Sequence, residues 1–449
     1  MSDISICFVA NFHKTELFDL WAKSLQVEKK NIFWITTNQK IYNNLAKDYL
    51  INNILLVNWE TFDKFEYLGE FNLNELVYGD RLLRYQKKKG LKWLRSIQKP
   101  LIDFISTANI KFIIGELTWA HEILIMRIVK YLKDLNCVYL NPHTVRIPNS
   151  RFAFFLDEFQ TELYENQLEA PSKEFLEKEF TIKKPDYFNL NNEIIKKSRT
   201  AFSKIKRLRR FFTRENIDKY DPTLPNNPIL QFKLRALEEF NREAYYFIQK
   251  TPWEAIKDKK YALLALHKQP EASIDVLGRY AEDQLQNIRN IWRILPENCL
   301  LVIKEHTNAI GDRSLSFYRE INKLPRVVLI DEKIDSYILI RNADYIFSVS
   351  GTIAYEAALL DKKAFTLCRT FFNKLKYCSY INSFNNADYY LKLQASCGNM
   401  DKQEFYSWLW ARSFPGIISD PISNIDCSSE QNITLLARAL TAVINDYVN

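Results

Sequence analysis

The side chains best suited to chemistry in this sequence gather in short segments that follow apolar, strand-like runs. The segment LHKQPEASIDVLG, residues 266–278, holds two carboxylates four positions apart. A carboxylate can attack an electrophilic carbon or take a proton from an attacking hydroxyl. The alternative interpretation is a helix start lined with acids that suit its dipole. The residues expected to act chemically here are Glu271 and Asp275, and those expected to bind a ligand are His267 and Gln269.

A second segment, KEHTNAIGDR, follows the apolar run over residues 300–304. Its cations, Lys304 and Arg313, can neutralise a phosphate, and the imidazole of His306 can donate a hydrogen bond or a proton to a departing group. A single histidine more often has a structural role. The position of His306 directly after a predicted strand and beside Lys304 favours a functional role.

A third segment, SVSGTIAYEA, joins a predicted strand to a predicted helix. Small hydroxyl residues and a glycine at a helix start offer free N–H groups and a positive dipole end to a phosphate. An ordinary N-cap would have the same composition. Neither G-x-G-x-x-G nor G-x-x-x-x-G-K-[ST] occurs, which disfavours an NAD-binding or P-loop protein. We expect phosphate contacts from Ser348, Ser350, Gly351 and Thr352, and ribose contacts from Glu356.

The N-terminal half offers fewer candidates. Glu116 follows the predicted strand over residues 112–115 and is a candidate general base. Downstream, Arg146 and Arg151 are candidate clamps for an acidic ligand, although surface ion pairs would explain both arginines equally well.

Strands and helices alternate in two stretches of the chain, as in a doubly wound parallel sheet. Ligands bind at the carboxyl ends of such strands, which is where the polar segments fall. We predict an N-terminal Rossmann-like domain over 1–165 and a second over 256–425. A charged, helical insertion or linker over 166–255 separates the two domains, and a C-terminal helix over 426–449 follows them.

The net charge of +8 is concentrated in residues 196–214, which contain nine Lys or Arg and no acid. Phe202, Ile205, Leu208 and Phe212 recur there at helical spacing, so one face is apolar and the other basic. This pattern suits an anionic membrane surface. A solvated helix over the core and a nucleic-acid contact are the alternatives, and the lack of any nucleic-acid-binding signature leads us to expect no nucleic acid.

The seven cysteines lie far apart, with no C-x-x-C pair and no histidine at ligand spacing. We therefore expect reduced thiols and no metal site. The N-terminus lacks the pattern of a signal peptide, and no apolar run is long enough to cross a bilayer. The expected location is the cytoplasm, with peripheral attachment to the inner face of the inner membrane as an option.

The order and spacing of HKQPEASID, LVIKEHT, GDR, RVVLID and ADYIFSVSGTIAYEAALL, over residues 261–367, resemble the capsule-polysaccharide biosynthesis family that includes bacterial retaining β-Kdo transferases. The resemblance extends through GE and RIPNSRF near 115–152. It implies a GT-B fold, in which two Rossmann-like domains face a cleft. It also implies a CMP-activated 3-deoxy-ulosonic acid as donor, a glycan or glycolipid acceptor, and no metal or other cofactor.

The resemblance further implies a double displacement through a sugar–carboxylate adduct. Aligning the EAS element selects Glu271 as nucleophile, whereas the usual aspartate of the family favours Asp275. The sequence also departs from the family at Thr307, where proline is common. The alternatives are a transferase of a nine-carbon acid such as pseudaminic acid, a UDP-sugar transferase, and a non-catalytic subunit of a polysaccharide assembly complex.

Overall fold

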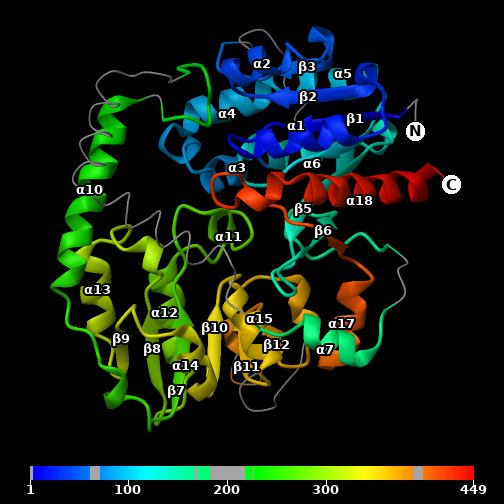
Figure 1. The fold of residues 1–449 in the computed structure, drawn as a ribbon. Helices are drawn as coiled ribbons and strands as arrows, with labels where there is room; N and C mark the ends of the chain where they lie inside the picture. The colour runs from blue at the N-terminus through cyan, green and yellow to red at the C-terminus, as the bar shows by residue number, and fades with distance from the viewer. Residues whose placement is uncertain are drawn as a thin grey trace. The chain divides into compact units, whose positions relative to one another are not determined.

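The computed structural model describes residues 4–60, 71–166, 170–182, 218–225, 227–386, 388 and 398–448. The chain forms two compact units (Figure 1). Unit 1 comprises Met1–Glu158, Glu162–Pro228 and Trp408–Asn449, and unit 2 comprises Phe159–Thr161 and Ile229–Ser407. The C-terminal segment therefore belongs to the same unit as the N-terminal one.

Unit 1 is built on a seven-stranded sheet with the order β13-β6-β5-β4-β1-β2-β3. The strands β1 to β5 run parallel to one another, whereas β6 and β13 add an antiparallel edge. The central strands consist of β-branched, aromatic and other apolar residues that are buried on both faces, as expected for a covered parallel sheet. The strands are β1 (Ser5–Val9), β2 (Ile32–Thr36), β3 (Ile54–Leu56), β4 (Ile110–Ile114), β5 (Val138–Thr144), β6 (Arg151–Phe155) and β13 (Phe414–Pro415).

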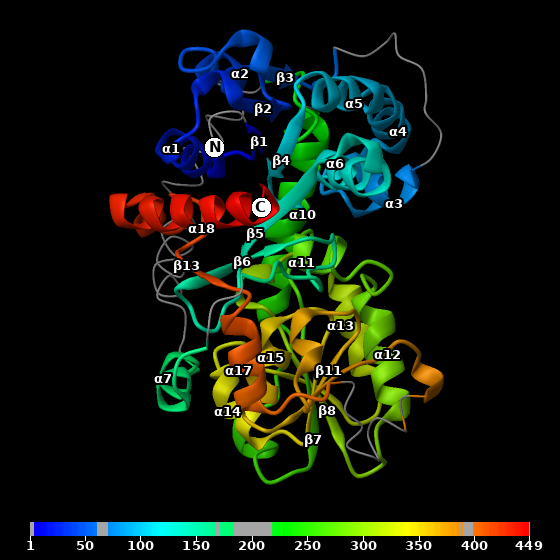
Figure 2. The same ribbon diagram turned by 90° about the vertical axis from the view of Figure 1, so that its right-hand side faces the viewer.

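Helices cover both faces of this sheet. The long C-terminal helix α18 (Glu430–Val448) lies beside α1 (Lys14–Ser24) on one face (Figure 2). Its apolar residues Leu436, Leu440 and Val443 recur every three to four positions and pack into the core with Trp21 of α1. The other helices among the described residues of unit 1 are α2 (Gln39–Leu45), α3 (Leu73–Gly79), α4 (Lys87–Ser96), α5 (Gln98–Thr107), α6 (Ala120–Tyr131) and α7 (Lys173–Glu179).

Unit 2 contains a six-stranded, wholly parallel sheet with the order β12-β11-β10-β7-β8-β9. Its strands are β7 (Tyr261–Ala265), β8 (Leu300–Lys304), β9 (Val327–Ile330), β10 (Tyr345–Ser348), β11 (Lys363–Thr366) and β12 (Cys378–Tyr380). One core packs apolar side chains of these strands against the following helices, with Leu264, Ile288 and Ile321 at its centre. The helices are α10 (Pro228–Tyr246), α11 (Ala272–Asp275), α12 (Gln284–Ile294), α13 (Leu315–Asn322), α14 (Ser336–Asn342) and α15 (Thr352–Leu359). Helix α17 (Lys402–Trp410) ends the segment that leads back to unit 1.

Each sheet has one topological switch point, the position at which its strand order reverses. In unit 1 the reversal lies between β1 and β4, and in unit 2 it lies between β7 and β10. The loops that leave the carboxyl ends of such strand pairs diverge and leave room for a ligand. The predicted fold class, two Rossmann-like α/β domains, is confirmed.

Some boundaries differ from the sequence-based expectations. Residues 408–425 were expected in the second domain, but they return to unit 1, where β13 pairs with β6 through Phe414 and Phe152. The sequence pattern predicts no strand at β3, β6, β12 or β13, which are short or lie at or near an edge of their sheets. The sequence pattern predicts a helix over 277–294, but α12 begins only at Gln284, because Asp283 caps it by accepting from the N–H of Gln286.

The basic stretch 196–214 lies outside the described residues. In the part of the chain that is described, no helix combines the length and apolar character needed to cross a bilayer.

Candidate active site

The switch point of unit 2 is closed by hydrogen bonds between the loops after β7 and β10. Nε2 of His267 lies 3.0 Å from Oγ of Ser348, which also accepts the N–H of Gly351 at 3.0 Å. The N–H of Ser350 donates to the same imidazole nitrogen at 3.4 Å. A Cβ on Gly351 would lie 2.5 Å from Oγ of Ser348 in the same segment and 3.2 Å from Cε1 of His267 in the other loop, so the packing at this position favours glycine.

His267 is a neutral acceptor in this arrangement. Burial, with smaller contributions from His306 and Arg313, lowers the pKa of His267 to about 3. Its Nε2 is unprotonated because it accepts the N–H of Ser350. The side chain of His267, predicted to touch a ligand, therefore holds the loop after β10 in place.

Within the segment predicted to bind phosphate, the start of α15 is the part whose N–H groups are available to an anion. The N–H groups of Ser350 and Gly351 already have partners, while Thr352, the first helical residue, is exposed. The N–H groups of a first helical turn have no partner within the helix. Glu356 is buried one turn further in. Of the residues predicted to contact a phosphate, only those at the helix start, from Thr352 on, have N–H groups available for it.

The two candidate nucleophiles differ in availability. Oδ1 of Asp275 accepts from the amide of Gln269 at 2.9 Å, and Oδ2 accepts the N–H of Glu271 at 3.0 Å. Asp275 is buried, whereas Glu271 is half-buried and accepts from Oγ of Ser273 at 2.9 Å. Asp275 therefore shapes the loop, and Glu271 presents its carboxylate.

The two predicted cations are held inside the protein. The ammonium of Lys304 donates to the carbonyls of Glu332 and Ile334, both at 2.8 Å, in the loop after β9. Burial lowers the pKa of Lys304, opposed by the nearby acids Glu332, Asp331 and Asp335. Arg313 lies 2.5 Å from the buried carboxylate of Glu305 and donates to the carbonyl of His267. Both side chains fix loops around the switch point.

Glu305 and its partners position His306. The carboxylate of Glu305 accepts from Arg313, from the hydroxyl of Tyr318 at 2.6 Å and from the N–H of His306 at 2.8 Å. Burial raises the pKa of Glu305, and the charge of Arg313 opposes that rise. Helix α10 supports the same loop, because Nδ2 of Asn241 donates to the carbonyl of Gly311 at 3.3 Å.

His306 presents a donor to the site. Its Nδ1 accepts the N–H of Asn308 at 3.2 Å, which leaves the proton of the neutral ring on Nε2. The side chain of His306 is exposed, but neighbouring protein atoms still desolvate the ring and lower its pKa. The charge of the Glu271 carboxylate opposes this lowering. Glu271 and His306 are thus electrostatic neighbours at the ends of β7 and β8.

Two further residues join this site that the sequence did not single out. The charge of Lys268 lowers the pKa of both His306 and Asp312, so its ammonium lies near both. Burial raises the pKa of Asp312 to about 6, and its Oδ2 has no hydrogen-bond partner among the described residues. Lys268 could have been predicted from the sequence, because it is a cation that follows directly after a predicted strand.

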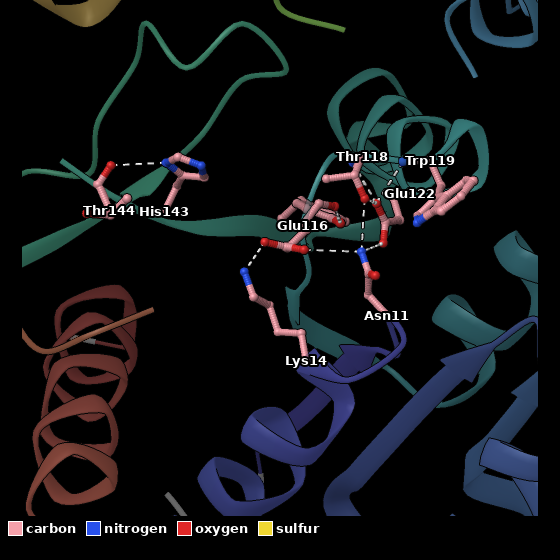
Figure 3. Close-up of polar contacts among 9 residues, drawn as sticks. Asn11, Lys14, Glu116, Thr118, Trp119, Glu122, His143 and Thr144 are labelled. Carbon is pink, nitrogen blue, oxygen red and sulfur yellow. Dashed lines mark hydrogen bonds and ion pairs between the residues drawn. The ribbon is translucent and has the colours of Figure 1, made fainter. Parts of the chain in front are cut away.

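The switch point of unit 1 carries a second polar cluster (Figure 3). Glu116, after β4, forms an ion pair with Lys14 of α1 and accepts from the amide of Asn11, after β1, at 3.2 Å. The same Asn11 amide donates to Glu122 at 2.8 Å and to Thr118 at 2.9 Å. Only Glu116 of this cluster was predicted: Thr118 and Glu122 follow it in the same segment, and Asn11 and Lys14 come from a segment about 100 residues earlier.

Glu122 is fully buried and holds the start of α6. It accepts the N–H groups of Thr118 at 2.7 Å and of Trp119 at 3.0 Å. Burial and the charge of Glu116 raise the pKa of Glu122 to about 8. Glu116 and Glu122 therefore form a pair of carboxyl groups in different environments.

The predicted arginine clamps lie elsewhere in unit 1. Arg151 is buried, donates to Oγ of Ser413 at 2.9 Å and stacks 3.7 Å from the ring centroid of Trp410. Arg146 donates to the amide of Asn149 at 2.9 Å. The contacts of Arg151 tie β6 to the returning C-terminal segment.

The described residues contain no group of three or more His, Cys, Asp and Glu side chains arranged to hold a metal ion.

No family model and no curated protein matches the chain. Several solved structures are similar to it. The chain is similar to the β-Kdo 2,7 transferase of KpsC from Thermosulfurimonas dismutans, with 11% identity over 99% of each chain and a TM-score of 0.38. The β-Kdo 2,4 transferase of the same KpsC has 12% identity over 76% of this chain and 88% of that chain, with a TM-score of 0.35. A putative UDP-N-acetylglucosamine 2-epimerase from Listeria monocytogenes has 10% identity, coverage of 100% and 97%, and a TM-score of 0.31.

Proposed function

We propose that this protein is a glycosyltransferase that moves a 3-deoxy-ulosonic acid, Kdo or a related acid, from a CMP-activated donor to a bacterial surface-polysaccharide acceptor. The observation that carries the proposal is the placement of Glu271 after β7 and His306 after β8, at the carboxyl ends of adjacent strands, where the Glu271 carboxylate acts electrostatically on the His306 ring. The exposed helix start at Thr352 follows β10, on the other side of β7. A carboxylate, a phosphate-binding helix start and a ring N–H donor are the groups that a displacement of a sugar phosphate requires.

Unit 2 binds the donor in this proposal. The phosphate of CMP accepts hydrogen bonds from the helix start at Thr352, and its charge is balanced by the ammonium of Lys268. The neutral ring of His306 donates its Nε2 proton to the same phosphate. Glu356 contacts the nucleoside. No metal ion is part of this donor site.

The reaction proceeds in two displacements. A carboxylate oxygen of Glu271 forms a bond to the anomeric carbon while the bond from that carbon to the phosphate oxygen breaks, so CMP leaves with the electron pair. An acceptor hydroxyl then attacks the same carbon, loses its proton to a base and releases the Glu271 carboxylate. Two inversions give retention of configuration, and one difficult step becomes two easier ones.

Asp275 acts as a positioning residue in this scheme. It fixes the backbone N–H of Glu271 and the amide of Gln269, so its own oxygens are not available for attack. His267 and Ser348 likewise hold the two loops at the distance that the donor needs.

The test is a donor screen with the purified full-length protein. Thermal unfolding is measured with CMP, UDP and NAD, because a ligand at 100 times its Kd raises stability by about 2.7 kcal/mol. Transfer from CMP-Kdo, CMP-pseudaminic acid and a UDP-sugar to short synthetic acceptors is measured in parallel. We expect stabilisation by CMP but not by UDP or NAD, and transfer from CMP-Kdo.

The alternatives give other patterns. Transfer from CMP-pseudaminic acid in place of CMP-Kdo assigns a nine-carbon acid donor. Stabilisation by UDP without CMP assigns a UDP-sugar transferase. Glycan binding with no turnover of any donor identifies a non-catalytic subunit.

A further inference from the structure

Unit 1 contains a cavity of about 570 Å³ at the amino ends of its strands. Its wall includes Ile4, just before β1, Lys111 in β4, and Val138, the first residue of β5. The cluster around Glu116 lies at the carboxyl ends of the same strands, so the cavity occupies the opposite edge of the sheet. Small-molecule sites commonly have volumes of about 300–1,000 Å³, and this cavity falls within that range.

The buried part of the cavity wall is apolar. Phe112 of β4 and both Met126 and Val129 of α6 line the cavity and are buried. Tyr447, near the end of α18, also lines it and contacts Phe112 edge-on, with 5.5 Å between the ring centroids. Transfer of an aliphatic or aromatic group from water to such a wall is favourable. The wall therefore favours a ligand with an apolar body.

The charged residues of the wall are mainly cations. They are Lys111, Lys130 and Lys133, and the one acid that lines the cavity is Glu162. Lys130 lies 3.8 Å from Glu162 in an exposed pair, and such pairs contribute little. Lys111 and Lys133 have no ion-pair partner among the described residues. An anionic group in the cavity therefore meets two positive charges that the protein does not neutralise.

A structural role accounts for only part of this charge. Lys130 lies in the last turn of α6, where a cation suits the negative end of the helix dipole. Lys111 lies on β4 and has no such role. Burial raises the pKa of Cys137, another residue of the wall, to about 12, and the charge of Lys111 opposes the rise. The ammonium of Lys111 therefore acts on a thiol of the cavity wall.

We propose that this cavity binds an anionic amphiphile, a molecule with an aliphatic or aromatic body and a phosphate or carboxylate head. The body packs against Phe112 and Val129, and the head accepts hydrogen bonds from the ammonium groups of Lys111 and Lys133. Hydrogen bonds between ionised groups are the strong ones, which favours a charged head over a neutral one. A soluble metabolite and a membrane lipid share this chemistry. The site is separate from the sugar donor site proposed for unit 2.

The first experiment is a calorimetric titration of the full-length protein with decyl phosphate below its micelle concentration. Decanol and inorganic phosphate are titrated in parallel. We expect decyl phosphate to bind more tightly than either. The double variant Lys111→Ser and Lys133→Ser should bind decyl phosphate about tenfold more weakly, which corresponds to about 1.4 kcal/mol, and should bind decanol as wild type does.

The matched control is the double variant Lys29→Ser and Lys88→Ser, which removes two exposed cations of the same unit outside the cavity. It should bind decyl phosphate as wild type does. Val138→Trp places a large side chain in the cavity wall and should weaken the binding of decyl phosphate and decanol together.

A second measurement requires no substitution. Cys137 is half-buried, whereas the other cysteines in the described part of the chain are buried, so its thiol can report on the cavity. Alkylation by N-ethylmaleimide is followed by peptide mapping. Decyl phosphate at about ten times its Kd should slow alkylation of Cys137 about tenfold, because the free protein falls to about one tenth. Inorganic phosphate should have no effect.

Cosedimentation with anionic vesicles separates the two sources of the ligand. Weaker vesicle binding by the variant at Lys111 and Lys133 than by the control assigns the headgroup and chain of a membrane lipid. Equal vesicle binding, together with weaker binding of decyl phosphate, assigns a soluble molecule.

Three results would overturn the proposal. They are equal affinities of the cavity variant and the control for decyl phosphate, wild-type binding of decanol as tight as that of decyl phosphate, and alkylation of Cys137 that decyl phosphate does not slow. None of these measurements uses a sugar donor, so their outcome is independent of the proposed function.

Discussion

Nε2 of His267 lies 3.0 Å from Oγ of Ser348, and this contact joins the loops after β7 and β10 where the strand order of unit 2 reverses. The N–H of Gly351 donates to the same hydroxyl. The segment predicted to bind phosphate is thus held by a histidine 81 residues away in the chain.

Replacing Ser348 with alanine removes a partner from both His267 and Gly351. We expect a loss of about 1–3 kcal/mol in the free energy of unfolding, since buried polar groups are left unsatisfied. Thermal or denaturant unfolding measures this. Thr352→Val is the matched variant: its exposed side chain should leave stability nearly unchanged while CMP affinity weakens by about 1–3 kcal/mol. Equal CMP affinity in Thr352→Val and wild type would count against the phosphate site.

Arg313→Met should be among the most damaging single changes in unit 2. It leaves the carboxylate of Glu305 buried without its ion-pair partner, at a cost of about 3–5 kcal/mol. The control is Arg289→Met, because the Arg289–Glu320 pair is exposed and should contribute about 1 kcal/mol or less. Chemical denaturation gives the free energy of unfolding of both variants. Equally small losses in the two variants would show that the Arg313–Glu305 pair does not stabilise the loop.

The stability of unit 1 should depend on pH through Glu122. Its pKa is raised from 4.5 to about 8, so the folded state binds one more proton than the unfolded chain between these values. The stability that this group provides is complete below its ordinary pKa and is lost as the pH rises through about 8. The slope is at most about 1.4 kcal/mol per pH unit.

Glu122→Gln cannot ionise and should flatten that dependence between about pH 5 and pH 8. The exposed Glu28 gives the control variant Glu28→Gln, which should keep the wild-type slope. Unfolding free energies measured across this range test the assignment, and an unaltered slope in Glu122→Gln would refute it.

The basic stretch 196–214 should promote binding to anionic vesicles, more strongly at low salt. Each cation near the surface contributes about 1 kcal/mol. Cosedimentation with anionic and neutral vesicles is compared for wild type and for the triple variant Arg207→Ser, Arg209→Ser and Arg210→Ser. We expect weaker binding by the variant to anionic vesicles, and unchanged binding would rule out this role.

The strand-and-helix alternation was visible in the sequence because buried parallel strands are short apolar runs separated by helices. It therefore located the loops that carry Glu271, His306 and Thr352. It did not locate β13, a two-residue edge strand, or β6, the antiparallel strand beside it, because neither follows the alternation of parallel strands and helices. Nothing local in Trp408–Asn449 indicates that this segment packs in unit 1.

The roles of individual side chains depended on partners distant in the chain. Lys304 and Arg313 looked like phosphate ligands, yet their partners are backbone carbonyls and Glu305. The choice between Glu271 and Asp275 likewise followed from which carboxylate already accepts two hydrogen bonds. Such partners are set by tertiary contacts that spacing does not reveal.

The different roles assigned to Glu271 and Asp275 predict different effects of their substitution on the stability of unit 2. Asp275→Asn should destabilise unit 2, because an amide nitrogen replaces one of two acceptors that hold Gln269 and the N–H of Glu271. Glu271→Ala should fold as stably as wild type, since the side chain is half-buried and contacts mainly Ser273. Thermal unfolding of both variants provides the comparison, and the reverse order of stabilities would exchange the two roles.

The most direct measurement is intact-mass spectrometry of the protein incubated with CMP-Kdo without acceptor, followed by peptide mapping. The predicted result is one added sugar on a peptide that contains Glu271, in wild type and in Asp275→Asn, with none in Glu271→Ala. A sugar adduct that persists in Glu271→Ala, or transfer with inverted anomeric configuration, would contradict the double displacement at Glu271.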